Sequence, residues 1–156
     1  MVTLMMIPAS IHAGQLPEIA PSFTATDLSG KSANLAGFRG KIVFLVFWAS
    51  WCAPCREELP ELDRLYKKFK TEGFEVIAIS VDASESDVKS YLRKFPISFP
   101  VLLDKKGDVN DAYRVSGLPT GFLIGKNGII RHIHRGFGKE LLPMYEKEIT
   151  DLIKQK

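Results

Sequence analysis

Ile42-Val43-Phe44-Leu45-Val46-Phe47-Trp48-Ala49-Ser50-Trp51-Cys52-Ala53-Pro54-Cys55 is the stretch that joins a run of apolar residues to the only two cysteines of this 156-residue chain. Residues 42–48 are uniformly apolar, which predicts a strand that is buried on both faces of a sheet. Apolar residues then recur at helical spacing, at Cys55, Leu59, Leu62, Tyr66 and Phe69. The sequence therefore predicts a Cys-x-x-Cys motif between a buried strand and the N-terminus of a helix.

The position of the two cysteines at a helix N-terminus favours thiol chemistry. Free backbone N–H groups and the helix dipole stabilise negative charge there, so we expect a lowered pKa for the Cys52 thiol. Cys55 follows one helical turn later, close enough to close a ring with Cys52. The alternatives are structural thiols or half of a zinc site, but zinc normally takes four ligands and no other cysteine exists. We therefore predict a redox pair and no metal, with Cys52 as the nucleophile and Cys55 as the resolving thiol.

The rest of the chain alternates strand and helix patterns. Residues 17–35 are typical of an extended hairpin, and Asn127-Gly128 predicts a second hairpin near the C-terminus. Ser84-Glu85-Ser86-Asp87 resembles a capping box at the start of a helix. The predicted strands after the motif are 74–81, 101–103, 121–124 and 129–134, and the predicted helices are 84–95, 108–115 and 141–152. This alternation predicts an α/β fold with a mixed β-sheet.

Size and composition indicate one ordinary globular domain. Hydrophobic residues make up 46% of the chain and charged residues 25%, and a chain of this length can bury a single core. The formal net charge is +3, and the Lys and Arg residues are scattered, so no nucleic-acid surface is expected. Two cysteines are too few for a structural disulfide scaffold.

Residues 1–15 differ from the rest of the chain. A short uncharged apolar run is followed by small residues up to Ala13, which resembles the end of a secretory signal peptide without its basic start. The run is shorter than the roughly 20 apolar residues that span a membrane. We expect an exported protein, or one tethered by a truncated leader, with a folded domain at 16–156. The open alternative is a disordered N-terminus of a cytoplasmic protein.

Three motifs carry a resemblance to a known family. They are, in order, the run from Phe47 to Arg56, Gly117-Leu118-Pro119-Thr120, and Asn127-Gly128 between two apolar runs. Together they resemble the thioredoxin superfamily, and within it the TlpA/ResA-like bacterial thiol–disulfide oxidoreductases. The resemblance implies a thioredoxin-like mixed β-sheet flanked by helices. It also implies an N-terminal β-hairpin extension and a central helix–strand insertion at 82–103.

The same resemblance assigns residues around the cysteines. Pro119 would be the cis-proline of the superfamily, which would turn the backbone of Leu118 toward the cysteines to pair with a substrate strand. The expected substrate-binding residues are Leu118, Thr120, Trp51 and Pro54, of which Thr120 is more structural than catalytic. Trp51 is expected to be an apolar substrate contact at the rim of the site, with plain packing as the alternative. Pro54 removes one N–H donor that could stabilise a thiolate, which should make the pair less oxidising.

Glu58 follows Cys55 by three residues, so about one helical turn separates its carboxyl from the thiols. Thioredoxin has a buried Asp on the preceding strand, where Val46 stands here, and the TlpA/ResA-like branch instead keeps a Glu at the position of Glu58. We interpret Glu58 as the proton acceptor for Cys55 and as a charge that raises thiol pKa values. The alternative is an ordinary solvated Glu on the helix surface.

The resemblance implies an enzyme that exchanges disulfides with protein substrates, acting outside the cytoplasm as a reductant, with cytochrome c maturation as the commonest assignment among relatives. It implies no cofactor beyond the Cys52–Cys55 disulfide. It also implies an upstream reductant, such as a membrane thiol-transfer protein, and a monomer. Thr120 stands where relatives of the CcmG/DsbE type carry an acidic residue, which favours the more general TlpA/ResA type.

Two other functions remain open from the sequence. A peroxiredoxin-type peroxidase would need Thr or Ser three residues before its reactive cysteine, where Ala49 stands here. A copper-handling Sco-type protein would need a Cys-x-x-x-Cys spacing, which is one residue longer. His132 and His134 share one face of a predicted strand and could form a metal pair, but we interpret them as a solvated edge beside Arg131 and Arg135.

Overall fold

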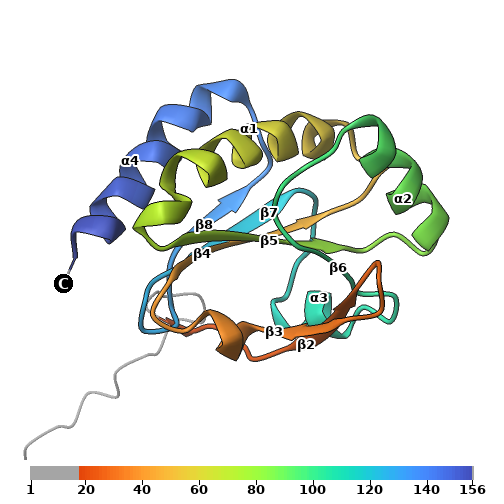
Figure 1. The fold of residues 1–156 in the computed structure, drawn as a ribbon, viewed down its shortest axis with the longest axis horizontal. Helices are drawn as coiled ribbons and strands as arrows, with labels where there is room; N and C mark the ends of the chain where they lie inside the picture. Colours follow the sequence, from red (N-terminus) through yellow and green to blue (C-terminus); the bar gives the residue numbers. More distant parts are fainter. Residues whose placement is uncertain (1–17, 156) are drawn as a thin grey trace, which may run out of the picture.

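The computed structural model describes residues 18–155, in which eight strands form one sheet in the order β1-β8-β7-β4-β5-β6-β2-β3 (Figure 1). The strands are β1 Glu18–Ile19, β2 Thr24–Asp27, β3 Ser32–Asn34, β4 Ile42–Trp48, β5 Phe74–Ser80, β6 Val101–Leu103, β7 Thr120–Ile124 and β8 Ile129–Arg135. Strands β4, β5 and β6 are parallel, and all other neighbours are antiparallel. The predicted mixed sheet is confirmed. The signal-peptide remnant predicted at 1–15 lies outside the described residues.

Strand β4 lies at the centre of the sheet and ends next to the cysteines. All seven of its residues are buried, as the uniformly apolar run predicts. Its even-numbered residues, such as Phe44, pack into one core, and its odd-numbered residues, such as Leu45, pack into a second core on the opposite face. The strand is therefore held from both sides, which gives the motif at its end a rigid base.

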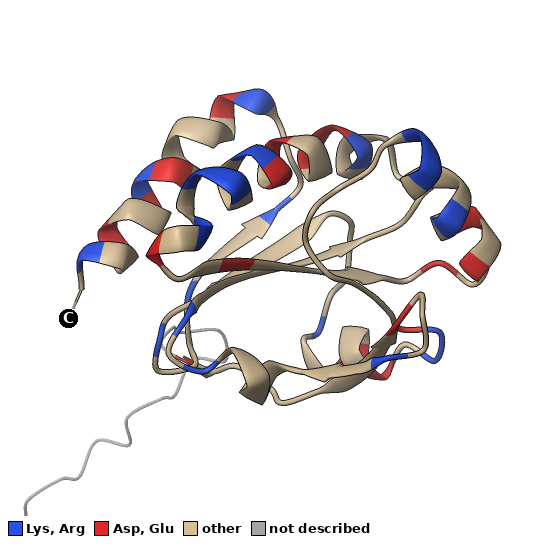
Figure 2. Ribbon diagram, in the orientation of Figure 1, with Lys and Arg blue, Asp and Glu red and all other residues tan. Residues whose placement is uncertain are grey.

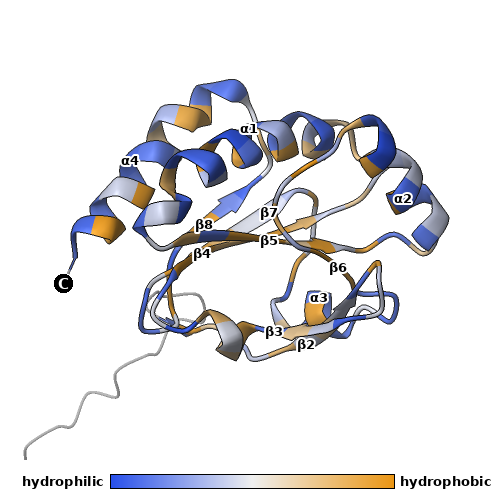
Figure 3. Ribbon diagram, in the orientation of Figure 1, coloured by the Kyte–Doolittle hydropathy of each residue, from blue (hydrophilic) through white to orange (hydrophobic). Residues whose placement is uncertain are grey.

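Helices cover the two faces unequally. The α-helices are α1 Ala53–Phe69, α2 Glu85–Lys94, α3 Asp108–Ala112 and α4 Leu142–Lys154, and short 3₁₀ turns occupy Leu35–Phe38, Lys70–Glu72 and Lys139–Leu141. Helices α1, α2 and α4 pack on one face, and α3 packs on the other with the N-terminal segment (Figure 1). Each α-helix carries apolar residues among hydrophilic ones (Figure 3), and these apolar residues pack into the two cores. Charged residues concentrate on the helices rather than on the central strands (Figure 2). Among residues 18–155, no helix combines the length and apolar character needed to cross a membrane.

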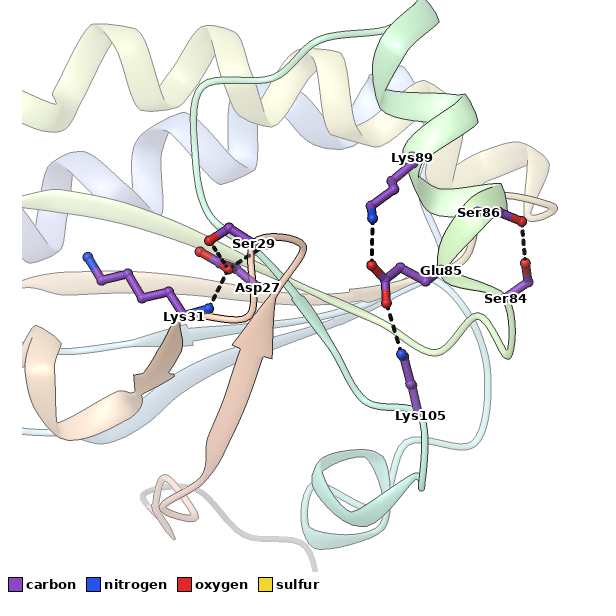
Figure 4. A network of polar contacts seen from close by, with 8 residues as sticks. All are labelled: Asp27, Ser29, Lys31, Ser84, Glu85, Ser86, Lys89 and Lys105. Carbon is purple, nitrogen blue, oxygen red and sulfur yellow. Dashed lines mark hydrogen bonds and ion pairs between the residues drawn. The ribbon is translucent and has the colours of Figure 1, made fainter.

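The predicted N-terminal hairpin is confirmed as β2 and β3, which extend the sheet beyond β6. Its turn is closed by the Asp27 carboxylate, which accepts hydrogen bonds from the backbone N–H groups of Ser29 and Lys31 (Figure 4). The two-residue strand β1, which pairs with β8, was not predicted, because so short a strand has no readable alternation.

The central helix–strand segment is confirmed as α2 and β6, but the predicted capping box at Ser84 is wrong. The Ser84 side chain makes no capping hydrogen bond and instead lies 2.8 Å from the hydroxyl of Ser86. The residue three positions on is Asp87, whose side chain is one methylene shorter than the Glu or Gln of a capping box. Glu85 fixes the start of the helix in another way, through ion pairs with Lys89 and Lys105 at 2.7 and 2.9 Å (Figure 4).

Candidate active site

The two cysteines form a disulfide where β4 passes into α1. Cys52 is the N-cap residue of α1, Cys55 lies in the first helical turn, and their Cα atoms are 5.3 Å apart. Cys52 retains 6% exposure, whereas Cys55 is fully buried. Cys52 is therefore the sulfur that an incoming group can reach, and the order of nucleophile and resolving thiol stays a prediction.

One backbone donor faces the Cys52 sulfur. The N–H of Cys55 points at Cys52 Sγ at 3.4 Å, and Pro54 supplies no N–H in the same turn. A thiolate at Cys52 would thus be stabilised by the helix N-terminus, although with one donor fewer than an ordinary first turn provides.

The loop before β7 lies beside the disulfide. The peptide bond between Leu118 and Pro119 is cis, as the family resemblance implies. An open groove runs between this loop and the motif, and its lining includes Trp51, Cys52, Pro54, Val81, Gly117 and Leu118. Trp51 is 69% exposed, so it is not packed into the core and presents its ring at the rim of the groove. Thr120 is buried and donates its hydroxyl to the Gly117 carbonyl at 2.7 Å, so it shapes the loop rather than reaching into the groove.

Glu58 is a buried carboxyl group on the inner face of α1. Only 1% of the residue is exposed, so the alternative of a solvated helix Glu is wrong. Its Oε1 accepts a hydrogen bond of 2.9 Å from the Tyr145 hydroxyl, and its Oε2 has no hydrogen-bond partner within the described structure. Burial raises the pKa of Glu58 to about 7, and the hydrogen bond from Tyr145 acts in the opposite direction.

Asp82 is a buried carboxylate at the site that the sequence analysis missed. It accepts the N–H of Ser50 at 2.9 Å, the hydroxyl of Ser50 at 2.5 Å and the hydroxyl of Ser80 at 2.8 Å. Because β4 and β5 are parallel, the residues after each strand meet at the same edge of the sheet. An Asp directly after the second of two buried parallel strands was the available signal.

The predicted solvated edge at His132 and His134 is wrong for His134. The two side chains do share one face, but His134 is 5% exposed and His132 is 40% exposed. The His134 ring packs against both Phe44 and Tyr145, with ring centroids 5.9 and 4.5 Å away. Helix α4 covers this end of β8 more fully than the alternation of the strand could indicate.

Glu148 of α4 contacts both histidines. Its Oε2 lies 2.8 Å from His134 Nε2 without hydrogen-bond alignment, and its Oε1 lies 3.2 Å from His132 Nδ1. Burial lowers the pKa of His134 to about 4 and raises the pKa of Glu148 to about 7. Within residues 18–155, no group of three or more His, Cys, Asp or Glu side chains is arranged to hold a metal ion.

The AhpC/TSA family profile matches residues 17–133. The thiol-disulfide oxidoreductase ResA of Bacillus thuringiensis subsp. konkukian (strain 97-27) is 45% identical over 132 residues, covering 84% of this chain and 76% of the relative. The ResA of Bacillus anthracis is 42% identical over 137 residues, covering 87% of this chain and 79% of the relative.

Solved structures agree with these relatives. A Chlorobium tepidum protein described as a thiol:disulfide interchange protein DsbE superposes with a TM-score of 0.85 at 36% identity, covering 88% of this chain and 96% of that one. A Bacteroides thetaiotaomicron protein described as a protein disulfide isomerase has a TM-score of 0.82 at 30% identity, covering 90% and 91%. With the Cys52–Cys55 disulfide at a helix N-terminus beside a cis-proline, the chain belongs to the AhpC/TSA family and, within it, to the ResA-like thiol–disulfide oxidoreductases of the thioredoxin superfamily.

Proposed function

We propose that this protein is a reductant of protein disulfides that acts outside the cytoplasm. The observation that carries the proposal is the placement of Cys52, which is the accessible sulfur of the pair, at the N-terminus of α1 and on the groove beside Leu118. A buried partner sulfur, a neighbouring buried carboxyl group and an apolar groove together support exchange with a polypeptide rather than with a small oxidant.

The reaction begins with the reduced pair. The Cys52 thiolate attacks one sulfur of a substrate disulfide, which forms a mixed disulfide and releases the second substrate sulfur as a thiolate that takes up a proton. Cys55 then loses its proton and attacks Cys52 Sγ, which releases the first substrate sulfur as a thiol. Two electrons pass from the protein to the substrate, one proton comes from Cys55 and the other from the solvent, and the Cys52–Cys55 disulfide remains. No cofactor beyond this disulfide is required.

Glu58 is proposed as the acceptor of the Cys55 proton. It lies one helical turn after Cys55 and has an oxygen without a partner, so a thiol proton has a place to go. Its pKa of about 7 suits a group that takes up and returns a proton near neutral pH. An acceptor inside the protein is needed because Cys55 is buried and its thiol proton cannot pass directly to water.

The groove is proposed to hold an extended substrate segment. The backbone of Leu118 would pair with the substrate strand, and the exposed ring of Trp51 and the side of Pro54 would provide apolar contacts. Thr120 contributes through its hydrogen bond to Gly117, which maintains the shape of the loop.

The setting and partners are proposed from relatives. A Mycobacterium tuberculosis structure described as a secreted disulfide oxidoreductase has a TM-score of 0.74 at 25% identity, which supports an extracytoplasmic location. An upstream reductant, such as a membrane thiol-transfer protein, would return the pair to the dithiol, and the protein would act as a monomer. Apocytochrome c with an oxidised C-x-x-C-H motif is the substrate that we infer from the family resemblance, because cytochrome c maturation is the commonest assignment among TlpA/ResA-like proteins.

A measurement of the reduction potential, combined with a peptide assay, tests the direction of the reaction. A reductant should lie nearer the value of about −270 mV for thioredoxin than that of about −120 mV for DsbA. It should also reduce an oxidised C-x-x-C-H peptide, with hydrogen peroxide as the control substrate for the peroxidase alternative. A potential near that of DsbA, with net oxidation of the reduced peptide, would reverse the proposed direction.

A further inference from the structure

Tyr145 connects the C-terminal helix to the buried carboxyl group of Glu58, which lies one helical turn after Cys55 on α1. It lies in the first half of α4 and is fully buried, and its hydroxyl donates to Glu58 Oε1 at 2.9 Å. Within the described structure, the Glu58 side chain makes this one hydrogen bond, because its Oε2 has no partner. A buried carboxyl group with a single donor depends on that donor for its orientation.

The ring of Tyr145 is held firmly, so the position of its hydroxyl is well defined. Phe44 of β4 lies 5.2 Å away between ring centroids, His134 of β8 lies 4.5 Å away, and Phe137 lies 6.2 Å away. His134 in turn packs against the Phe44 ring and lies next to Glu148. Packing of three aromatic rings around one phenol restricts its rotamer, and the hydrogen bond transmits this restriction to Glu58.

We propose that Tyr145 is a positioning residue for the thiol chemistry: its hydroxyl holds one oxygen of the Glu58 carboxyl group and leaves the other oxygen free to receive the proton of Cys55. The proposal rests on the proposed role of Glu58 and adds a residue from an element far along the chain. The Tyr145 hydroxyl touches no reacting atom, so it acts through Glu58 alone.

The charge on Glu58 should depend on this hydroxyl. A hydrogen bond donated to a carboxylate stabilises the charged form, and burial disfavours it. The other titratable groups around the phenol are Glu148 on α4 and His134 on β8, while β4 presents the apolar Phe44. Tyr145→Phe removes only the hydroxyl and retains the packed ring. It should therefore leave Glu58 buried without a donor and keep it protonated to higher pH.

The first test uses the oxidised protein, in which the cysteines do not titrate. Carbon-13 NMR of the Glu side-chain carboxyl groups should show the midpoint of Glu58 moving to higher pH in Tyr145→Phe, by about one pH unit for the loss of a hydrogen bond to a charged group. Glu58→Gln identifies the resonance by its absence. Tyr113→Phe is the matched control, because Tyr113 is also buried and its hydroxyl donates to the Pro21 carbonyl at 2.8 Å on the opposite face of the sheet. An unchanged Glu58 midpoint in Tyr145→Phe would overturn the proposal.

The second test uses the reduced protein and a double substitution. Tyr145→Phe should shift the thiol titration in the same direction as Glu58→Gln, and it should add nothing when Glu58 is already Gln. A shift of equal size in both backgrounds would mean that Tyr145 acts by packing, and the proposal would fail. If Glu58→Gln shifts the titration but Tyr145→Phe does not, Tyr145 is excluded while the role of Glu58 stands. If Glu58→Gln does not shift the thiol titration, the proposed role of Glu58 fails and that of Tyr145 fails with it. The proposal that the protein reduces disulfides is tested separately by the peptide assay and would not fail with them.

Discussion

Ser50 donates both its backbone N–H and its hydroxyl to the buried carboxylate of Asp82, so the loop before Cys52 is tied to the end of β5. The two residues are 32 positions apart in the chain. This contact fixes the segment between β4 and the N-cap of α1, which sets the direction in which Cys52 meets the groove.

Asp82→Asn should loosen that loop. The amide retains one accepting oxygen and places an NH₂ group against hydroxyl and N–H donors. We expect a loss of about 1–3 kcal/mol in the free energy of unfolding, measured by urea denaturation. Insulin reduction per folded molecule should also slow. Asp63→Asn is the matched control, because Asp63 is likewise buried and accepts the Ser98 N–H at 2.6 Å, but it lies two turns beyond Cys55. Equal rates for the two variants would show that Asp82 serves stability alone.

The two cysteines should differ in what their variants do. Cys52→Ser should abolish insulin reduction, because the accessible nucleophile is lost. Cys55→Ser should still attack substrates but should leave the mixed disulfide unresolved, so non-reducing gels should show protein adducts that disappear with dithiothreitol. Accumulation of adducts with Cys52→Ser instead would reverse the assignment.

The negative charge of Glu58 should raise the pKa values of the thiols through electrostatic repulsion. A carboxylate near a thiol disfavours a second negative charge, so Glu58→Gln should lower at least one thiol pKa by about one unit, which corresponds to about 1.4 kcal/mol. Absorbance of the thiolate and the pH dependence of alkylation measure this in the reduced protein. Glu57→Gln, at the exposed neighbouring position, is the charge-matched control. Superimposable titrations for Glu58→Gln and wild type would leave Glu58 without a role in thiol ionisation.

His134 and His132 should respond differently to truncation, although they lie two residues apart. His134→Ala removes a buried ring that packs against Phe44 and Tyr145, and we expect a loss of about 2–4 kcal/mol in the free energy of unfolding. His132→Ala, at a more exposed position, should stay within about 0.5–1 kcal/mol of wild type. Thermal or urea unfolding of both variants provides the comparison, and equal losses would contradict the burial difference.

Local patterns in the sequence were sufficient to predict the centre of the fold and the thiol pair. The apolar run at 42–48, the helical spacing after Cys55 and the Asn127-Gly128 turn each involve residues close in sequence, and the corresponding elements are β4, α1 and the hairpin of β7 and β8. The cis bond at Pro119 was implied by family resemblance and not by any local pattern.

Contacts between distant segments could not be predicted. Glu58 and Tyr145 are 87 positions apart, and only the packing of α4 on β4 brings them together. The burial of His134 depends on the same helix, because alternation along β8 shows which residues share a face but not how far a neighbouring helix covers that face.

The buried carboxyl group should also give the oxidised protein a characteristic dependence of stability on pH. The pKa of Glu58 is raised from an ordinary 4.5 to about 7 in the folded protein. A raised pKa means that the folded state binds more protons than the unfolded state between these two values. Stability from protonated Glu58 is therefore fully present below about pH 4.5 and is lost as the pH rises through about 7.

The contribution of Glu58 is isolated by subtracting the free energy of unfolding of Glu58→Gln from that of wild type at each pH. Glu148, with a pKa raised to about 7, and His134, with a pKa lowered to about 4, titrate in both proteins and cancel in the difference. We expect wild type to lose about 3 kcal/mol relative to the Gln variant between pH 4.5 and pH 7, since each unit of pKa difference corresponds to about 1.4 kcal/mol. Urea unfolding of the oxidised proteins at several pH values in this window measures the change. A difference that stays constant with pH, or that grows in favour of wild type as the pH rises, would show that the pKa of Glu58 is not raised in the folded protein, so that its carboxylate is too weak a base to hold a proton near neutral pH.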